Sequence, residues 1–258
     1  SPVVNADSSG RYLLPVGQSL TLTLDSAIST AAVVQWRRNG QPIVGATGRA
    51  QTVSVGGYYQ ARYLVGTQTV LSAPIFVHEQ LTRSQVVGWG YNGYGQTTIP
   101  SGISSAVVLA AGENHSLGLT PTGTVVAWGY SGSNRTSVPS GLSGVVSIAA
   151  GSAHSLALKS DGTVVAWGDN GYGQTTIPAG LSGVVAIAAG YSHGLALKSD
   201  GTVAAWGNNA SGATQVPTGL ANAVAVVAGN QFSVALKSDG TVVAWGNNSS
   251  GQTTVTSA

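Results

Sequence analysis

Apolar and polar residues alternate in short stretches through both halves of the chain. In the second half the alternation returns with a fixed period, because Trp-Gly pairs follow one another every 39 residues, at Trp89, Trp128, Trp167, Trp206 and Trp245. Alternation over a few residues is the pattern of a half-buried β-strand. The sequence therefore predicts an all-β protein that contains a tandem repeat.

Each repeat unit is predicted to form three or four short strands. A β-branched run ends in Trp-Gly, and an Asp-Gly pair lies between two alternating apolar runs at Asp161-Gly162, Asp200-Gly201 and Asp239-Gly240. Asp and Gly tolerate the positive φ of tight hairpin turns, so the strands should be sequential and antiparallel. Four strands in about 40 residues is the spacing of propeller blades, which bury their apolar faces against neighbouring blades.

Two strings carry a family resemblance: Val-Val-Ala-Trp-Gly-Asp-Asn-Gly-Tyr-Gly-Gln-Thr-Thr-Ile-Pro at 164–178, and Ala-Ala-Gly-x-x-His-Ser-Leu-Ala-Leu at 149–158. They resemble the repeats of the regulator-of-chromosome-condensation superfamily, and are most similar to the bacterial β-lactamase-inhibiting propellers. The resemblance covers about residues 84–258. It implies a propeller fold, whose members serve as exchange factors, inhibitors and scaffolds, so it names no single function.

The number of units departs from that family, whose members close seven blades. Here five Trp-Gly strands flank four modules, at 106–119, 145–158, 184–197 and 223–236, and seven units would need more than the 258 residues present. We expect about four blades plus a spare strand at Gln85–Gly90. Three readings stay open: an excised fragment, an unusually small ring, or an open arc whose edges pair between molecules, as exposed sheet edges do.

Residues 1–78 do not repeat, and their short strands predict a β-sandwich. They resemble bacterial immunoglobulin-like domains. The resemblance makes Trp36 the core tryptophan and Tyr59 the tyrosine-corner residue, while Leu24 and Ala61 occupy the two positions of the absent disulfide. Residues 79–85 are predicted to be a linker, and 86–258 the repeat array.

Charged residues are scarce, at 7% of the chain with a net charge of +2. That charge is too small for the phosphate-neutralising surface of a nucleic-acid-binding protein. A surface with little charge repulsion favours self-association. The chain has no Cys, no apolar run long enough to span a membrane, and a composition that fits an extracellular or cell-surface location.

Residues that recur in every unit are predicted to build the blades. This applies to the five Trp-Gly tryptophans and to His115, His154 and His193, whose fourth equivalent is Phe232. A position that accepts Phe does not require imidazole chemistry, and blades hold equivalent positions apart, so no metal or other cofactor is expected. Glu113 with His115 lacks the second partner that acid–base catalysis usually needs, so no catalytic residue is assigned and the protein is not expected to be an enzyme.

The loops after Trp-Gly are where the units differ most. Tyr together with Asn, Ser and Gly is the composition of an antibody-like binding surface. If these loops bind a partner, the expected anchors are Tyr91, Tyr94, Tyr130, Arg135, Tyr172 and Tyr191.

Two functions follow from these patterns. The first is a secreted or surface structural protein that assembles head to tail through its repeat array and N-terminal domain. The alternative is a monomeric module that binds another protein or a glycan through the loops after Trp-Gly.

Overall fold

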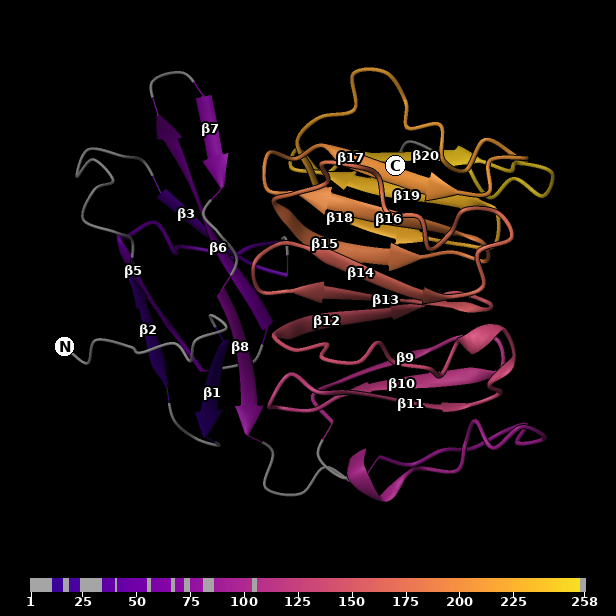
Figure 1. The fold of residues 1–258 in the computed structure, drawn as a ribbon. Coiled ribbons are helices and arrows are strands. Elements are labelled where there is room, and N and C mark those ends of the chain that lie inside the picture. Colours follow the sequence, from indigo (N-terminus) through magenta and orange to yellow (C-terminus); the bar gives the residue numbers. More distant parts are fainter. Residues whose placement is uncertain are drawn as a thin grey trace. The chain divides into compact units, whose positions relative to one another are not determined.

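The computed structural model describes residues 11–15, 19–23, 34–39, 41–54, 57–65, 68–71, 75–80, 86–103 and 106–255. It divides into two compact units, Ser1–Thr82 and Arg83–Ala258. Figure 1 traces both units as strands joined by loops, and the helices of the described residues are two short 3-10 turns, Ser101–Ile103 and Gly132–Asn134. The all-β prediction is confirmed.

In the first unit two sheets share one apolar core. The larger sheet has the order β1-β8-β6-β3-β4, with β7 paired to β6, and the smaller sheet pairs β2 with β5. Trp36 lies buried at the centre and donates its indole N–H to the Gly48 carbonyl at 2.9 Å. The strands are β1 Arg11–Pro15, β2 Leu20–Thr23, β3 Val34–Arg38, β4 Gln41–Pro42, β5 Ala50–Val53, β6 Gly57–Val65, β7 Gln68–Leu71 and β8 Ile75–Gln80.

This core agrees with a sandwich but does not decide its family. Tyr59 and Ala61 are buried beside Trp36, whereas Leu24 lies outside the described residues. The immunoglobulin-like assignment stays a prediction. Strand β8 extends to Gln80, two residues into the predicted linker, and residues 81–85 lie outside the described part.

The second unit is an array of four three-stranded antiparallel blades, which follow one another in chain order (Figure 1). The inner strand of each blade packs against the blade before it, as β12 does against β9 and β10. The described residues form an open arc, as predicted. The blades are β9 Val108–Ala111, β10 His115–Leu119 and β11 Val125–Gly129; β12 Val145–Ala150, β13 His154–Lys159 and β14 Val164–Gly168; β15 Val184–Ala189, β16 His193–Lys198 and β17 Val203–Gly207; β18 Ala223–Ala228, β19 Phe232–Lys237 and β20 Val242–Gly246.

The Asp-Gly hairpins are confirmed. Gly162 has φ +80°, while Asp161 accepts the Thr163 amide at 3.0 Å and pairs with Lys159 at 2.8 Å. The hydrogen bond from Lys159 lowers the pKa of Asp161 to about 2. The same turn recurs with Asp200 and Asp239, so in the last three blades the middle strand is connected tightly to the outer strand.

The prediction of a spare strand is wrong, because residues 86–90 do not form a strand. In the first blade Trp128 pairs with Ser116, twelve residues earlier. The equivalent partner of Trp89 would be Val77, which instead belongs to β8 in the sheet of the first unit. The segment still packs on the first blade, where Val86 and Ile99 cover Trp128.

Candidate functional site

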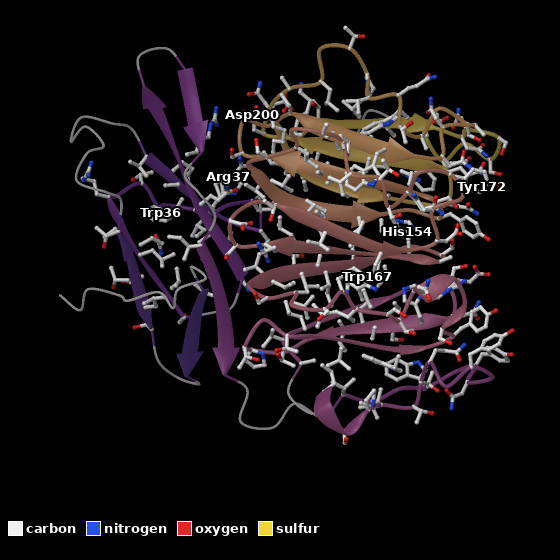
Figure 2. The ribbon with its side chains drawn as sticks, in the orientation of Figure 1. Trp36, Arg37, His154, Trp167, Tyr172 and Asp200 are labelled. Carbon is white, nitrogen blue, oxygen red and sulfur yellow. The ribbon has the colours of Figure 1, made fainter. Side chains whose placement is uncertain are left out.

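The two ends of the blades carry different kinds of loop. The Asp-Gly hairpins lie at one end, and the loops after Trp-Gly lie at the other, together with the turns between inner and middle strands. Figure 2 shows Asp200 and Tyr172 at these opposite ends. Main-chain bonds join the two kinds of loop, such as Tyr130 N to Asn114 O at 2.8 Å. We call this side of the array the loop end.

Side chains give the loop end a fixed frame. The Asn92 carboxamide accepts the Thr97 amide at 2.9 Å and donates to the Thr98 hydroxyl at 2.9 Å. The Gln96 carboxamide oxygen accepts the Tyr94 amide at 3.0 Å. Asn170 and Gln174 make the same bonds in a later loop. Sequence reasoning overlooked these residues, although their recurrence after Trp-Gly was visible in the repeat.

Four of the six predicted anchors come together at the loop end. Tyr94 lies between Tyr91 and Tyr130, with ring centroids 6.2 Å and 4.7 Å away. The Arg135 guanidinium lies 4.8 Å from the centre of the Tyr130 ring. We call Tyr91, Tyr94 and Tyr130 the tyrosine row.

Arg135 is not the free anchor that the sequence predicted. Its side chain is only 7% exposed and donates to the Gly132 carbonyl at 2.8 Å and to the Ser152 carbonyl at 3.2 Å. It occupies the position that Gln96 and Gln174 hold in other loops, and fixes its own loop instead. Sequence alone could not show that backbone carbonyls engage the guanidinium.

The other two predicted anchors stand apart from the row. Tyr172 is well exposed and, within the described residues, forms no ring pair. Tyr191 lies on a turn before a middle strand, where its carbonyl accepts the Ser152 hydroxyl at 2.6 Å. It lines an open depression of about 350 Å³ together with Glu113, Ser152 and Asn230, the equivalent residues of the other blades.

Four of the five repeat tryptophans are buried: Trp128 lies against the segment that precedes the first blade, and the other three lie between blades. Each donates its indole N–H to the carbonyl 32 residues earlier, as Trp167 does to Arg135 at 2.9 Å. Trp128, Trp206 and Trp245 repeat the bond with Gln96, Gln174 and Ala213. A tryptophan therefore locks its own blade to the loop of the preceding unit.

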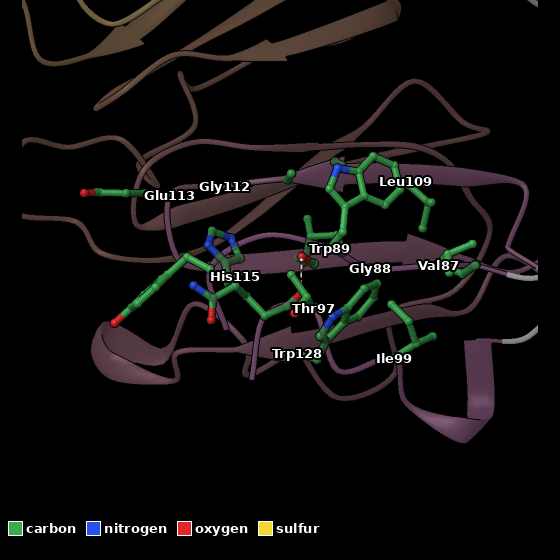
Figure 3. A pocket seen from close by; sticks show the side chains of 17 residues that line it. Val87, Gly88, Trp89, Thr97, Ile99, Leu109, Gly112, Glu113, His115 and Trp128 are labelled. Atoms are coloured by element: carbon green, nitrogen blue, oxygen red, sulfur yellow. Dashed lines mark hydrogen bonds between the residues drawn. The ribbon is translucent and has the colours of Figure 1, made fainter. Parts of the chain in front are cut away.

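Trp89 departs from the predicted core role, since its side chain is 83% exposed. Among the described residues no loop carbonyl accepts its indole N–H. Figure 3 shows it beside Leu109 and Val87 at a pocket of about 480 Å³ on the first blade. All three side chains are exposed, so this part of the array presents an apolar surface to solvent.

The three histidines lie in the inter-blade core. His115 Nε2 is 3.0 Å from the Ser155 hydroxyl of the next blade, and His193 Nε2 is 3.0 Å from that of Ser233. Because the Ser155 hydroxyl donates to the Arg135 carbonyl, it must accept from His115, which assigns the Nε2–H tautomer. Burial lowers the pKa of His115, His154 and His193 to about 4, so all three are neutral at pH 7.

His154 lacks this partner. Within the described residues neither of its buried ring nitrogens has a side-chain hydrogen-bond partner, because Gly194 stands where Ser155 and Ser233 stand in other blades. Within the described residues no three His, Asp or Glu side chains gather into a metal-binding group. Glu113 is exposed while His115 is bonded inward, so the two do not form an acid–base pair.

Comparison with known proteins supports the predicted repeat. The model of the regulator of chromosome condensation (RCC1) repeat matches residues 107–135, 145–174, 184–213 and 223–252, one match for each blade. No curated protein sequence matches the chain. The further resemblance to β-lactamase-inhibiting propellers stays a prediction.

Solved structures support the fold. The chain resembles Prp20p from Saccharomyces cerevisiae with 21% identity and a TM-score of 0.50, covering 76% of this chain and 55% of Prp20p. It resembles the ectodomain of the receptor kinase CR4 from Physcomitrella patens with 24% identity and a TM-score of 0.51, covering 74% and 49%. It resembles the ectodomain of the receptor kinase ACR4 from Arabidopsis thaliana with 22% identity and a TM-score of 0.51, covering 81% of this chain and 74% of that ectodomain. The chain thus spans about half the length of the first two proteins.

No helix in the described part of the chain has the length and apolar character that a membrane crossing requires.

Proposed function

We propose that this chain, an array of four RCC1 repeats, is a non-enzymatic protein-binding module whose partner is a second copy of itself. RCC1 repeats support the protein-binding part of the proposal: Prp20p, which shares the fold, is described by its binding to Gsp1p and histones. The second copy is inferred from the two ends of the array. The absence of Cys and Met fits a location outside the cell or on its surface.

The observation that carries the proposal is the uncovered face of the last blade. Leu117, Leu156 and Leu195 occupy one position in the first three blades, and each is fully buried under the next blade. Their equivalent, Val234, is only half-buried. Val227 is 59% exposed and Val242 40% exposed at positions where the inner blades bury more of their side chains. We call Val227, Val234, Leu236 and Val242 the last-blade face.

The two ends also carry complementary hydrogen-bonding groups. In every complete junction an indole N–H meets a loop carbonyl 32 residues earlier. At the start of the array, the Trp89 indole has no acceptor among the described residues. At the end, the Gln252 carbonyl corresponds to those of Gln96 and Gln174 and has no donor there.

Inner junctions provide the precedent for the contact. Trp167 packs on Leu117, Leu119 and Val125 of the preceding blade and donates to its loop. By the same arrangement, Trp89 of one copy packs on Val234, Leu236 and Val242 of another and donates to its Gln252 carbonyl. A contact between two different surfaces repeats from copy to copy, giving a fibre, or a ring if the rotation closes.

The first test changes one surface at a time. Trp89→Ala removes the projecting indole, and Val242→Lys places a charge on the last-blade face, so each variant should be monomeric where wild type assembles. Size-exclusion chromatography with light scattering measures the mass. Val44→Lys is the matched control, because Val44 is fully exposed in the first unit and its replacement should leave assembly intact.

Mixing the two variants sharpens the test. Trp89→Ala retains the last-blade face and Val242→Lys retains Trp89, so the mixture should form a one-to-one dimer that grows no further. Assembly that persists in both variants, or a mixture that stays monomeric, would contradict the head-to-tail contact.

A further inference from the structure

The tyrosine row is a second exposed surface, and the proposed self-assembly does not use it. It is formed by the loop that precedes the first blade and the loop that follows it. Tyr91 is 69% exposed, Tyr94 49% and Tyr130 41%. Contiguous exposed apolar surface often marks an interaction site. Three adjacent exposed aromatic rings therefore make the row a candidate binding site.

Two glycines let the outer rings lie against their loops. A Cβ built on Gly93 would come within 2.5 Å of the Tyr91 ring, and one built on Gly132 would come within 2.5 Å of the Tyr130 ring. Any larger residue would push the ring outward. With the backbone on one side, the Tyr91 ring presents its remaining surface to solvent, whereas the Arg135 guanidinium also lies over the Tyr130 ring and leaves less of it exposed.

The row is held in place before any ligand arrives. The Gln96 carboxamide fixes the Tyr94 main chain, and Asn92 fixes the turn beside it. Arg135 holds the second loop through two carbonyls and lies over Tyr130. A surface that is already ordered loses little conformational entropy on binding.

The chemistry of the row favours an uncharged ligand. The guanidinium of Arg135 is buried and engaged, so the row presents aromatic faces, phenol hydroxyls and loop amides. Pyranose rings have an apolar C–H face that stacks on aromatic rings, and hydroxyls at the rim that exchange hydrogen bonds with phenols and amides. Aromatic walls with a few polar groups are general features of small-molecule sites.

We infer that the tyrosine row binds a neutral oligosaccharide, whose sugar rings contact Tyr91, Tyr94 and the exposed part of Tyr130. The ring centroids lie 4.7 Å and 6.2 Å apart, and the ring planes meet at 47° and 77°. Adjacent ring faces and edges of this kind can contact more than one sugar of a chain.

Calorimetric titration with hexasaccharides of β-1,4-glucose, α-1,4-glucose and β-1,4-N-acetylglucosamine tests the inference. At least one should bind wild type and Val242→Lys alike, so that the result is independent of self-assembly. Tyr94→Ala should weaken that binding about tenfold or more, as loss of a central aromatic anchor does. Tyr94→Phe should retain it, since stacking needs the ring and not the hydroxyl.

Tyr172→Ala is the matched control. Tyr172 corresponds to Tyr94 two repeats later and has the same Gln-bonded main chain, but it forms no ring pair within the described residues. Its replacement should leave the affinity unchanged, with the thermal midpoint of each variant showing that it folds. Failure of all three sugars to bind overturns the inference, as does equal loss in Tyr94→Ala and Tyr172→Ala.

Discussion

The histidine position shows how a repeat uses one residue in different ways. In two junctions an imidazole donates to a serine of the next blade, in a third the serine is replaced by Gly194, and in the last blade the imidazole is replaced by Phe232. The periodicity predicted a structural role for these residues. It did not predict the bonded partner, because the partner lies 40 residues away in the next blade.

Replacing His154 and His115 by Phe should have different effects. His154→Phe removes two buried nitrogens that lack a side-chain partner, and it should leave the free energy of unfolding unchanged or raise it. His115→Phe also removes a hydrogen bond to Ser155, and should lower it by about 1 kcal/mol. Phe232 shows that the last blade, which no further described blade covers, has the larger ring at this position. Chemical denaturation measures the free energy of unfolding of both variants. An equal decrease in the two variants would contradict the account.

Acid should lower the free energy of unfolding of the array at pH values well above those at which its ion-paired aspartates titrate. Burial lowers the pKa of each of the three histidines from 6.5 to about 4, so between these values only the unfolded chain binds the protons. The free energy of unfolding should therefore fall as the pH drops from about 6.5 to 4, by up to about 1.4 kcal/mol per pH unit for each imidazole. Below pH 4 this contribution levels off.

Denaturation at several pH values measures that slope. The slope should be shallower in His154→Phe, which has one titrating group fewer. Stability that stays constant between pH 6.5 and 4 would show that the imidazoles are not buried in neutral form.

The inner strands of the blades approach one another through a column of glycines. A Cβ built on Gly112, Gly151 or Gly190 would lie 2.5 to 2.6 Å from the carbonyl oxygen of the next glycine in the column. Backbone cannot move away as a flexible side chain can. Glycine is therefore needed at the point where each turn passes the following blade.

Alanine substitutions in this column should be graded. Gly151→Ala forces two blades apart and should lower the free energy of unfolding by about 1 to 3 kcal/mol. Gly229→Ala should cost less, because its Cβ would meet only the Phe232 ring, which can turn. Gly102→Ala is the control, since nothing lies within 4 Å of its Cβ. Thermal denaturation should rank them in this order, and a harmless Gly151→Ala would contradict the close approach.

At the level of elements, the sequence predicted what local chemistry determines. The Asp-Gly turns and the order of strands followed from residues within one unit. The state of residues 86–90 did not, because whether a Trp-Gly segment forms a strand depends on a partner strand twelve residues earlier. The exposure of Trp89 could not be predicted for the same reason. Its place in the repeat is the same as that of the buried tryptophans, but its neighbours in space differ.

For the whole molecule, counting units predicted an array of about four blades and the open arc that the described residues form. It could not identify which side chains the open ends expose. Leu109 is 53% exposed where its equivalent Ile148 is 6% exposed, although both are aliphatic residues at the same position of the repeat. The difference comes from neighbours, so it appears only when the blades are assembled.

The loops after Trp-Gly likewise have one feature that the sequence predicts and another that depends on neighbours in space. The residue types after Trp-Gly pointed to a binding surface, and Tyr91, Tyr94 and Tyr130 are indeed adjacent in space. Arg135, Tyr172 and Tyr191 matched the same pattern but do not complete that surface. Adjacency between loops of successive units could not be derived from composition.

The most direct test of the account is the mass of the wild-type chain in solution as its concentration is raised. Light scattering should show the average mass rising steadily above that of one chain, and negative-stain microscopy of the same sample should show linear or ring-shaped assemblies. Uncovered apolar residues at both ends of the array and an unpaired indole at one of them predict that result. A chain that keeps the mass of a monomer at high concentration would contradict it.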